Sequence, residues 1–132
     1  MNIVIGSDHC GVELKAALAK ALAGVASVAD KGTNGTESCD YCDYAVAVAK
    51  DVASGKADFG ILICKTGIGM SMAANRFQNV RAALCATKED ATITRQHNGA
   101  NVLCLGADRV SAADAVEIAK TFVGTAVADE ER

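Results

Sequence analysis

The sequence predicts an α/β fold, a Rossmann-like three-layer sandwich around a five-stranded parallel sheet. Short apolar runs alternate with helical patterns along the chain, as expected for successive strand–helix units. The runs at residues 59–64 and 101–105 are almost entirely apolar. Such runs are typical of strands whose two faces are both covered, so we expect helices on each side of the sheet.

Ten elements are predicted in order along the chain. Apolar runs place strands at residues 2–6, 25–29, 59–64, 81–85 and 101–105. Helical patterns place the intervening helices near residues 11–23, 43–54, 69–76, 88–97 and 111–123. The polar stretch 31–38, which contains two glycines, is the longest expected loop.

Capping residues support several of the helix boundaries. Thr87 and Ser111 are expected N-caps, each with an aspartate three residues further along the chain. Gly24 and Gly55 lie where the first two helices should end.

Composition limits the classes of function. The 132 residues predict one domain, residues 1–132, with 51% hydrophobic and 22% charged residues and a net charge of −3. There is no basic run typical of nucleic-acid binding, and no apolar segment of the roughly 20 residues that cross a bilayer. Residues 1–6 indicate a buried strand rather than a signal peptide, and the six cysteines are interpreted as reduced thiols. We therefore expect a cytoplasmic protein without nucleic-acid or membrane partners.

Three polar segments are the candidates for a functional site. They are residues 6–9 after the first strand, residues 64–67 after the third strand and residues 95–98 at the end of the fourth helix. Ligands of open parallel sheets bind at the carboxyl ends of the strands, near the point where the strand order reverses. We expect all three segments to open on that edge.

Cys64 and the turn that follows it form one candidate. Gly67 and Gly69 let the backbone approach a ligand and begin a helix whose N–H groups can bind an anion. A thiol beside such a helix start can act as a base near neutral pH. A phosphate-binding turn beside a structural cysteine explains these residues equally well, because the turn is neither a Walker A loop nor a dinucleotide fingerprint.

The two histidines lie in the other two segments. Asp8 and His9 can transfer protons or bind hydroxyls and phosphate, but Asp8 can also be a helix cap beside an exposed histidine. His97, which precedes Asn98, is either a proton donor or a helix-terminal histidine that interacts with the helix dipole.

Five motifs occur in order along roughly residues 2–123. They are Gly6-Ser7-Asp8-His9-x-Gly11, Asp40-Tyr41-x-Asp43-Tyr44-Ala45, Gly60-Ile61-Leu62-Ile63-Cys64-x-Thr66-Gly67-Ile68-Gly69-Met70-Ser71, Arg81-Ala82-Ala83-Leu84-Cys85 and His97-Asn98-x-Ala100-Asn101-Val102-Leu103-Cys104-Leu105-Gly106-Ala107. Together they resemble the ribose-5-phosphate isomerase B family, which also contains the galactose-6-phosphate isomerase subunits.

The resemblance implies an aldose–ketose isomerase that interconverts D-ribose 5-phosphate and D-ribulose 5-phosphate through an enediolate, without a metal or other cofactor. Such an enzyme belongs to the pentose phosphate pathway of carbohydrate metabolism. Cys64 matches the base that moves a proton between C1 and C2. His97 matches the acid that opens the sugar ring, with Asp8 nearby.

The resemblance also implies how the substrate is held. Backbone N–H groups of the turn, with the Thr66 hydroxyl, match an anion hole for the enediolate, and its residues are Lys65, Thr66, Gly67, Ile68 and Gly69. His9 and Asn98 match positions that contact the substrate and its phosphate. Family members form homodimers with shared active sites, in which the histidine at position 97 comes from the partner.

Several residues depart from the family's pattern around the phosphate. Lys65 replaces the first glycine of the Cys-Gly-Thr-Gly-Ile-Gly turn. A lysine with positive φ is strained by about 1 kcal/mol, whereas an unstrained one could add positive charge for the phosphate. Asp108 occupies the place of a phosphate-binding arginine, and Arg109 replaces it if the loop shifts by one residue. The chain ends in Asp129-Glu130-Glu131-Arg132 and lacks the family's basic C-terminal extension.

Cysteine usage departs as well. Cys10 and Cys42 occupy places where alanine and proline are common, and the spacing of Cys39 and Cys42 is an occasional sign of a metal or redox site.

Three functions therefore compete. The chain is an isomerase of ribose 5-phosphate, a hexose 6-phosphate or another sugar; a noncatalytic family member that binds a sugar phosphate or supports a paired subunit; or a thiol-based redox or metal-binding protein.

Overall fold

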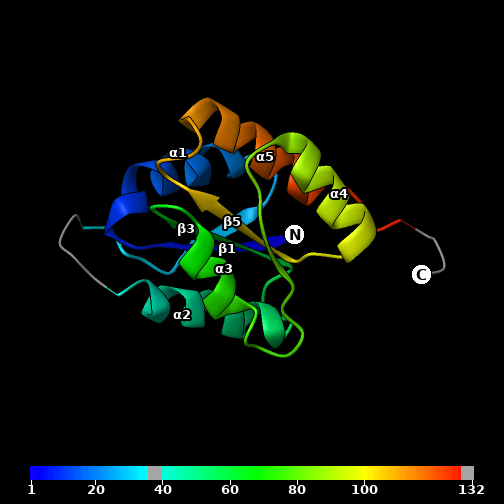
Figure 1. Ribbon diagram of the computed structural model, residues 1–132, viewed down its shortest axis with the longest axis horizontal. Helices are drawn as coiled ribbons and strands as arrows, with labels where there is room; N and C mark the ends of the chain where they lie inside the picture. The colour runs from blue at the N-terminus through cyan, green and yellow to red at the C-terminus, as the bar shows by residue number, and fades with distance from the viewer. Residues whose placement is uncertain (36–39, 129–132) are drawn as a thin grey trace.

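A computed structural model describes residues 1–35 and 40–128 and has the predicted α/β architecture (Figure 1). The strands are β1 (Asn2–Ser7), β2 (Ser27–Asp30), β3 (Phe59–Cys64), β4 (Ala82–Leu84) and β5 (Val102–Gly106). The helices are α1 (Val12–Leu22), α2 (Tyr41–Ala53), α3 (Ile68–Ala74), α4 (Lys88–Asn98) and α5 (Ala112–Gly124), with a short 3-10 helix, η1 (His9–Gly11), before α1. All strand pairs are parallel, in the order β2-β1-β3-β5-β4.

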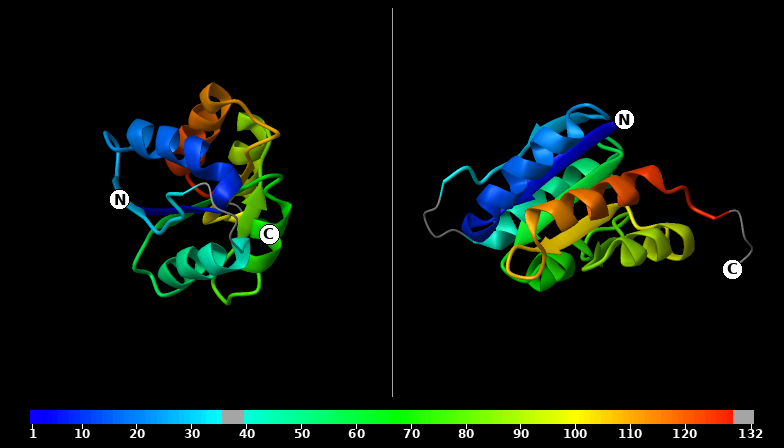
Figure 2. Two further views of the ribbon diagram at one scale, coloured as in Figure 1. Left: turned by 90° about the vertical axis from the view of Figure 1, so that its left-hand side faces the viewer. Right: turned by 90° about the horizontal axis from the view of Figure 1, so that it is seen from above.

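The sheet lies between two layers of helices, as predicted from its apolar strands (Figure 2). Alternate side chains of each central strand point to opposite faces. Ile61 and Ile63 of β3 pack in one apolar cluster with α1, α4 and α5, whereas Leu62 and Cys64 pack in a second cluster with α2 and α3. Both faces are therefore buried, and only the ends of the strands are open to a ligand.

All ten predicted elements are present, with small shifts at their ends. No end moves by more than two residues. For example, α2 begins at Tyr41 rather than at residue 43, because the Asp40 carboxylate accepts a hydrogen bond from the Cys42 N–H. Thr87 forms a full capping box with Asp90, and Ser111 caps α5. The 3-10 turn η1 was not predicted. It occupies two residues of the loop before the expected helix 11–23 and the first residue of that helix, Gly11.

A buried lysine fixes the segment that follows β2. The Lys15 side chain of α1 is 1% exposed, and its Nζ donates to Asp30 Oδ1 at 2.7 Å, to the Thr33 carbonyl at 2.6 Å and to Asn34 Oδ1 at 2.7 Å. The same segment pairs with the end of β1 through Ser7, whose N–H donates to the Gly32 carbonyl. Lys15 thus supports the strand end that leads to Asp8.

The cysteines of residues 1–35 and 40–128 form no disulfide, in agreement with their interpretation as thiols; they are Cys10, Cys42, Cys64, Cys85 and Cys104. Cys39, and with it the Cys39–Cys42 pair, lies outside the described residues. Within these ranges no helix has both the length and the apolar character required to span a bilayer.

Candidate active site

The carboxyl ends of β1, β3 and β5 meet at one edge of the sheet. The Asp8 N–H donates to the Ile63 carbonyl at 3.1 Å, which joins the end of β1 to the end of β3. The Ala107 N–H donates to the Cys64 carbonyl at 2.8 Å, which joins β3 to the loop after β5. In the sheet, β2 lies on one side of β1 and β3 lies on the other. The strand order therefore reverses between β1 and β3, the kind of point at which a ligand site was predicted.

Cys64 is held by the turn that follows it. Its side chain is 6% exposed, and its Sγ accepts a hydrogen bond from the Gly67 N–H at 3.1 Å. Gly67 has a φ of +80°, and a Cβ atom there would lie 2.5 Å from Leu84 Cδ1 and 2.9 Å from the Leu105 carbonyl carbon. Only glycine fits this position, because both its backbone conformation and its surroundings exclude a side chain. The thiol therefore has a fixed position beside the start of α3.

Two of the N–H groups predicted to form the anion hole already have partners within the turn. The Gly67 N–H donates to Cys64 Sγ, and the Ile68 N–H donates to Thr66 Oγ1 at 3.2 Å. The second bond is long for an N–H to oxygen contact, so an anionic oxygen can compete for this donor. Gly69 lies within the first turn of α3, where N–H groups have no partner in the preceding turn of helix.

Lys65 is not strained. Among the described residues other than glycine, only Asn79 has a positive φ. The alternative in which Lys65 adopts a strained backbone is therefore wrong. Its Nζ instead lies 3.8 Å from Asp108 Oδ2, with both side chains more than half exposed. The two residues that most alter the charge around the expected phosphate thus pair with each other.

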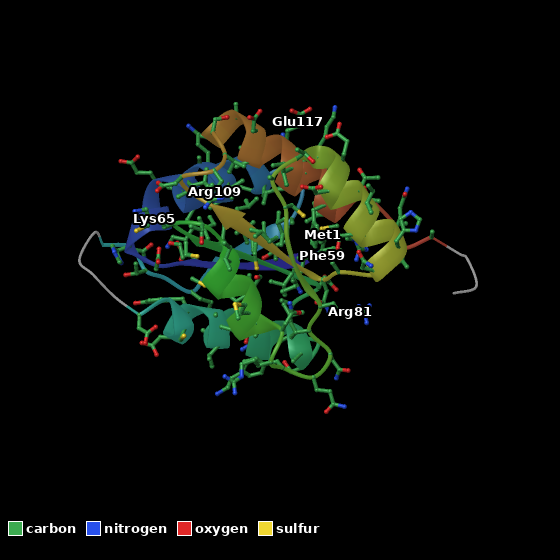
Figure 3. All side chains as sticks on the ribbon, in the orientation of Figure 1. Met1, Phe59, Lys65, Arg81, Arg109 and Glu117 are labelled. Atoms are coloured by element: carbon green, nitrogen blue, oxygen red, sulfur yellow. The ribbon has the colours of Figure 1, made fainter. Side chains whose placement is uncertain are left out.

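Arg109 lies on the same side of the molecule as Lys65 (Figure 3). Its Cγ is 2.9 Å from the position that a Cβ atom on Gly106 would take, and the Thr66 carbonyl oxygen is 2.5 Å from that same position. The stem of Arg109 therefore lies over Gly106 beside the turn.

Asp8 caps η1, as its structural interpretation predicts. Its side chain is 7% exposed, and its Oδ1 accepts a hydrogen bond from the Cys10 N–H at 2.9 Å. The cap also holds the carboxylate at the carboxyl edge, next to the end of β3. A structural and a chemical role are thus compatible at this residue. His9 follows it in η1 and is half-buried.

His97 and Asn98 lie at the opposite edge of the sheet, so the prediction that residues 95–98 share an edge with Cys64 is wrong. A helix between two parallel strands must return to the edge where the next strand begins. Accordingly, α4 ends just before β5, and the Asn98 carbonyl accepts a hydrogen bond from Arg81 Nε at the start of β4. Figure 3 shows Arg81 on the far side of the molecule from Lys65 and Arg109.

Cys85 and Cys104 differ from Cys64 in their surroundings. Burial raises the pKa of Cys85 to about 12, with a further increase from the Asp90 carboxylate. Burial also raises the pKa of Cys104, which is fully enclosed in β5. Both groups stay protonated at neutral pH, so they fill the core and do not serve as bases.

Known proteins share both the sequence and the fold of this chain. The family model for ribose/galactose isomerases matches residues 3–132. The chain is 46% identical to ribose-5-phosphate isomerase B of Escherichia coli over 124 residues, which cover 92% of this chain and 80% of that protein.

Solved structures agree with this result. The ribose 5-phosphate isomerase of Thermotoga maritima superposes with a TM-score of 0.95 at 44% identity, covering 98% of this chain and 90% of that one. Ribose-5-phosphate isomerase B of Mycoplasma genitalium, solved with bound ribulose-5-phosphate, gives a TM-score of 0.92 at 40% identity, covering 96% and 85%. The chain described here belongs to the ribose/galactose isomerase family.

Proposed function

We propose that this protein interconverts D-ribose 5-phosphate and D-ribulose 5-phosphate, with Cys64 as the base. The observation that carries the proposal is the Cys64 thiol at the end of β3, which accepts the Gly67 N–H at 3.1 Å within a tight glycine turn. A relative with ribulose-5-phosphate bound supports this substrate. A sugar phosphate is a charged metabolite that does not cross membranes freely, so we expect the enzyme to act in the cytoplasm, in the pentose phosphate pathway.

The proposed reaction moves one proton between neighbouring carbons. The Cys64 thiolate removes the proton from C2 of the open-chain aldose, and the electron pair of that bond forms the enediolate double bond as the C1 carbonyl oxygen becomes negative. Donors from the turn, among them the Ile68 and Gly69 N–H groups and the Thr66 hydroxyl, stabilise this oxygen. Cys64 then returns the proton to C1, and the C2 hydroxyl transfers its proton to the negative C1 oxygen, so that C2 becomes the ketone and C1 the alcohol.

Opening of the furanose ring requires a separate acid, and we assign this role to His97 of a partner subunit. Within one chain, β3 and β5 separate the two edges by roughly 13 Å, the rise of four residues in a strand. A single chain therefore carries Cys64 and His97 too far apart to act on one sugar. A homodimer with shared sites removes this difficulty, because each chain can complete the site of the other. Asp8, next to Cys64, assists the ring oxygen in the same site.

An exposed apolar face supports the dimer. It consists of four large side chains from α3, the edge strand β4 and α4, and these are Ile68, Met72, Leu84 and Ile93. Leu84 also packs against Gly67, since a Cβ atom added to Gly67 would meet Leu84 Cδ1. The apolar face therefore adjoins the turn that follows Cys64. A second copy that covers this face would lie next to Cys64.

The phosphate is held by cations that differ from those usual in the family. We assign this role to Arg109 and Lys65, with His9 of the same chain and Asn98 of the partner as further contacts. Arg109 crosses Gly106 beside the turn, and Lys65 extends from the turn itself. The negative charge of Asp108 opposes the positive charge of Arg109 and Lys65. The alternative substrate is therefore a sugar without phosphate, or one whose phosphate lies at another distance from the reacting carbons.

A substrate panel tests the proposal. Purified protein is incubated with ribose 5-phosphate, allose 6-phosphate, galactose 6-phosphate and unphosphorylated pentoses, and the ketose formed is measured. We expect the highest kcat/KM on ribose 5-phosphate, and a kcat about 10²–10⁴-fold lower in Cys64→Ala. Turnover of another sugar at a higher kcat/KM would change the substrate but keep the chemistry. No turnover of any sugar, with a thermal shift on addition of ribose 5-phosphate, would indicate a noncatalytic binding protein.

A further inference from the structure

Three possible metal ligands converge where β1 leads into η1. The Asp8 carboxylate, the His9 imidazole and the Cys10 thiol each offer one ligand atom, and these atoms lie within 4.8 Å of one another. The hydrogen bond from the Cys10 N–H to Asp8 Oδ1 closes the backbone into the turn that brings them together. A carboxylate, an imidazole and a thiolate are a ligand set that suits Zn²⁺.

The surroundings of Cys10 favour a cation. The charged side chains that act on its thiol are the Asp8 and Asp108 carboxylates and the Lys65 ammonium group. Lys65 is itself paired with Asp108. The thiol therefore lies in a region of net negative potential in which one lysine faces two carboxylates.

A hollow in the surface adjoins Cys10, one of the three ligands. It has a volume of about 350 Å³ and opens beside Cys10, with carboxylates from Glu13 of α1 and Asp108 of the loop after β5 on its wall. Cys10 is exposed, whereas Asp8 is almost completely buried behind it. A hydrated divalent cation can thus enter from solvent along acidic side chains and exchange water for protein ligands.

We propose that Asp8, His9 and Cys10 bind one Zn²⁺ ion, and that this ion inhibits the isomerase. Binding releases the Cys10 thiol proton to solvent and leaves a fourth coordination position for water. The proposed isomerisation needs no metal. Because that reaction uses Asp8 and His9, the metal and the sugar phosphate exclude each other. The inhibition rests on the proposed function, whereas the binding of the metal does not.

Cobalt binding tests the site without reference to activity. Metal-free protein is titrated with Co²⁺, and the thiolate-to-cobalt charge-transfer absorption in the near ultraviolet is recorded. We expect one equivalent to bind, Zn²⁺ to displace it, and the absorption to disappear in Cys10→Ala. Cys42→Ala and Cys64→Ala are the matched controls and should keep it. Absence of the band from the unmodified protein, or its loss in Cys64→Ala but not in Cys10→Ala, would overturn the site.

A second experiment tests the competition. Micromolar Zn²⁺ should raise the KM for ribose 5-phosphate at unchanged kcat, and EDTA should reverse the effect. Cys10→Ala should keep the activity measured without metal and require at least tenfold more Zn²⁺ for the same inhibition. If cobalt binds at Cys10 but Zn²⁺ leaves KM unchanged, the inhibition is wrong. A protein without any isomerase activity would count against the proposed function, and the cobalt spectrum would still decide whether the metal binds.

Discussion

The two edges of the sheet differ in how they hold the residues to which we assign the base and the acid. At the carboxyl edge, Cys64 and Asp8 are almost completely buried and lie next to a turn that only glycine can form. At the amino edge, where the strands begin, His97 is exposed in the last turn of α4, and the Asn98 carbonyl accepts a hydrogen bond from Arg81 Nε. This difference is consistent with our proposal that the carboxyl edge holds the base and that the amino edge offers an acid to a second copy.

The largest effect is expected from removing the base at the carboxyl edge. Cys64→Ala should lower kcat about 10²–10⁴-fold, the usual contribution of a positioned base, with little change in the thermal unfolding temperature. Steady-state kinetics on ribose 5-phosphate measure this loss. Cys42→Ala, which removes a half-buried thiol from α2, is the control and should keep full activity. Equal activity of the two variants would remove Cys64 from the mechanism.

Gly67→Ala tests whether activity depends on the geometry of the turn as well as on the Cys64 thiol. Gly67 and Gly55 both have a φ of +80°, but a Cβ on Gly55 meets nothing within 4 Å. Gly55→Ala should therefore cost only backbone strain, about 1 kcal/mol of unfolding free energy, and leave activity intact. Gly67→Ala should cost roughly 1–3 kcal/mol more through its contacts with Leu84 and Leu105, and it should lose most activity. Chemical denaturation and kinetics on both variants compare the two; equal costs would show that packing around the turn is not needed.

His97→Ala tests the amino edge. Because we assign His97 to ring opening and not to proton transfer at C1 or C2, we expect a loss of about 10²-fold on ribose 5-phosphate, which is mostly cyclic. Ribulose 5-phosphate, the substrate of the reverse reaction, cannot form this ring. The rate at which the enzyme exchanges its proton should therefore fall much less in His97→Ala. Exchange of solvent deuterium into ribulose 5-phosphate measures that step. The same loss in both assays would contradict a role in ring opening.

The smallest effects are expected from the exposed pair of Lys65 and Asp108. Exposed ion pairs contribute little, so Lys65→Gln should raise KM for ribose 5-phosphate only about two- to fivefold, and Asp108→Asn should lower it by a similar factor. Both changes should shrink at high ionic strength, because screening weakens the attraction to phosphate. Opposite signs in the two variants support a phosphate beside this pair. A KM that neither variant changes would locate the phosphate elsewhere.

The parts of the fold that depend on local chemistry were predictable from the sequence. The apolar runs of β3 and β5 predict buried parallel strands, and Thr87 with Asp90 predicts the start of α4. The rule for parallel sheets then predicts that Asp8 and Cys64 lie at one edge. These inferences need only the order of the elements along the chain.

Features that depend on contacts between distant segments were not predictable in this way. His97 was expected beside Cys64 although the return of α4 to the start of β5 places it at the other edge. Lys15 gives no sign in the sequence that its ammonium group is buried, since its three partners lie at the end of β2 and in the segment that follows it. The pairing of Lys65 with Asp108 likewise requires β3 and β5 to be neighbours, and their pairing in the sheet is not a local property.

The most direct test of the account is complementation between two inactive variants. Cys64→Ala lacks the base at one edge, and His97→Ala lacks the acid at the other. If every site combines the two edges of different chains, random mixing should restore about a quarter of the wild-type activity on ribose 5-phosphate, because half of the dimers are mixed and each of these contains one intact site. Unfolding and refolding the two proteins together, then measuring activity against each variant alone, provides the result. A mixture no more active than its components would contradict an active site shared between two chains.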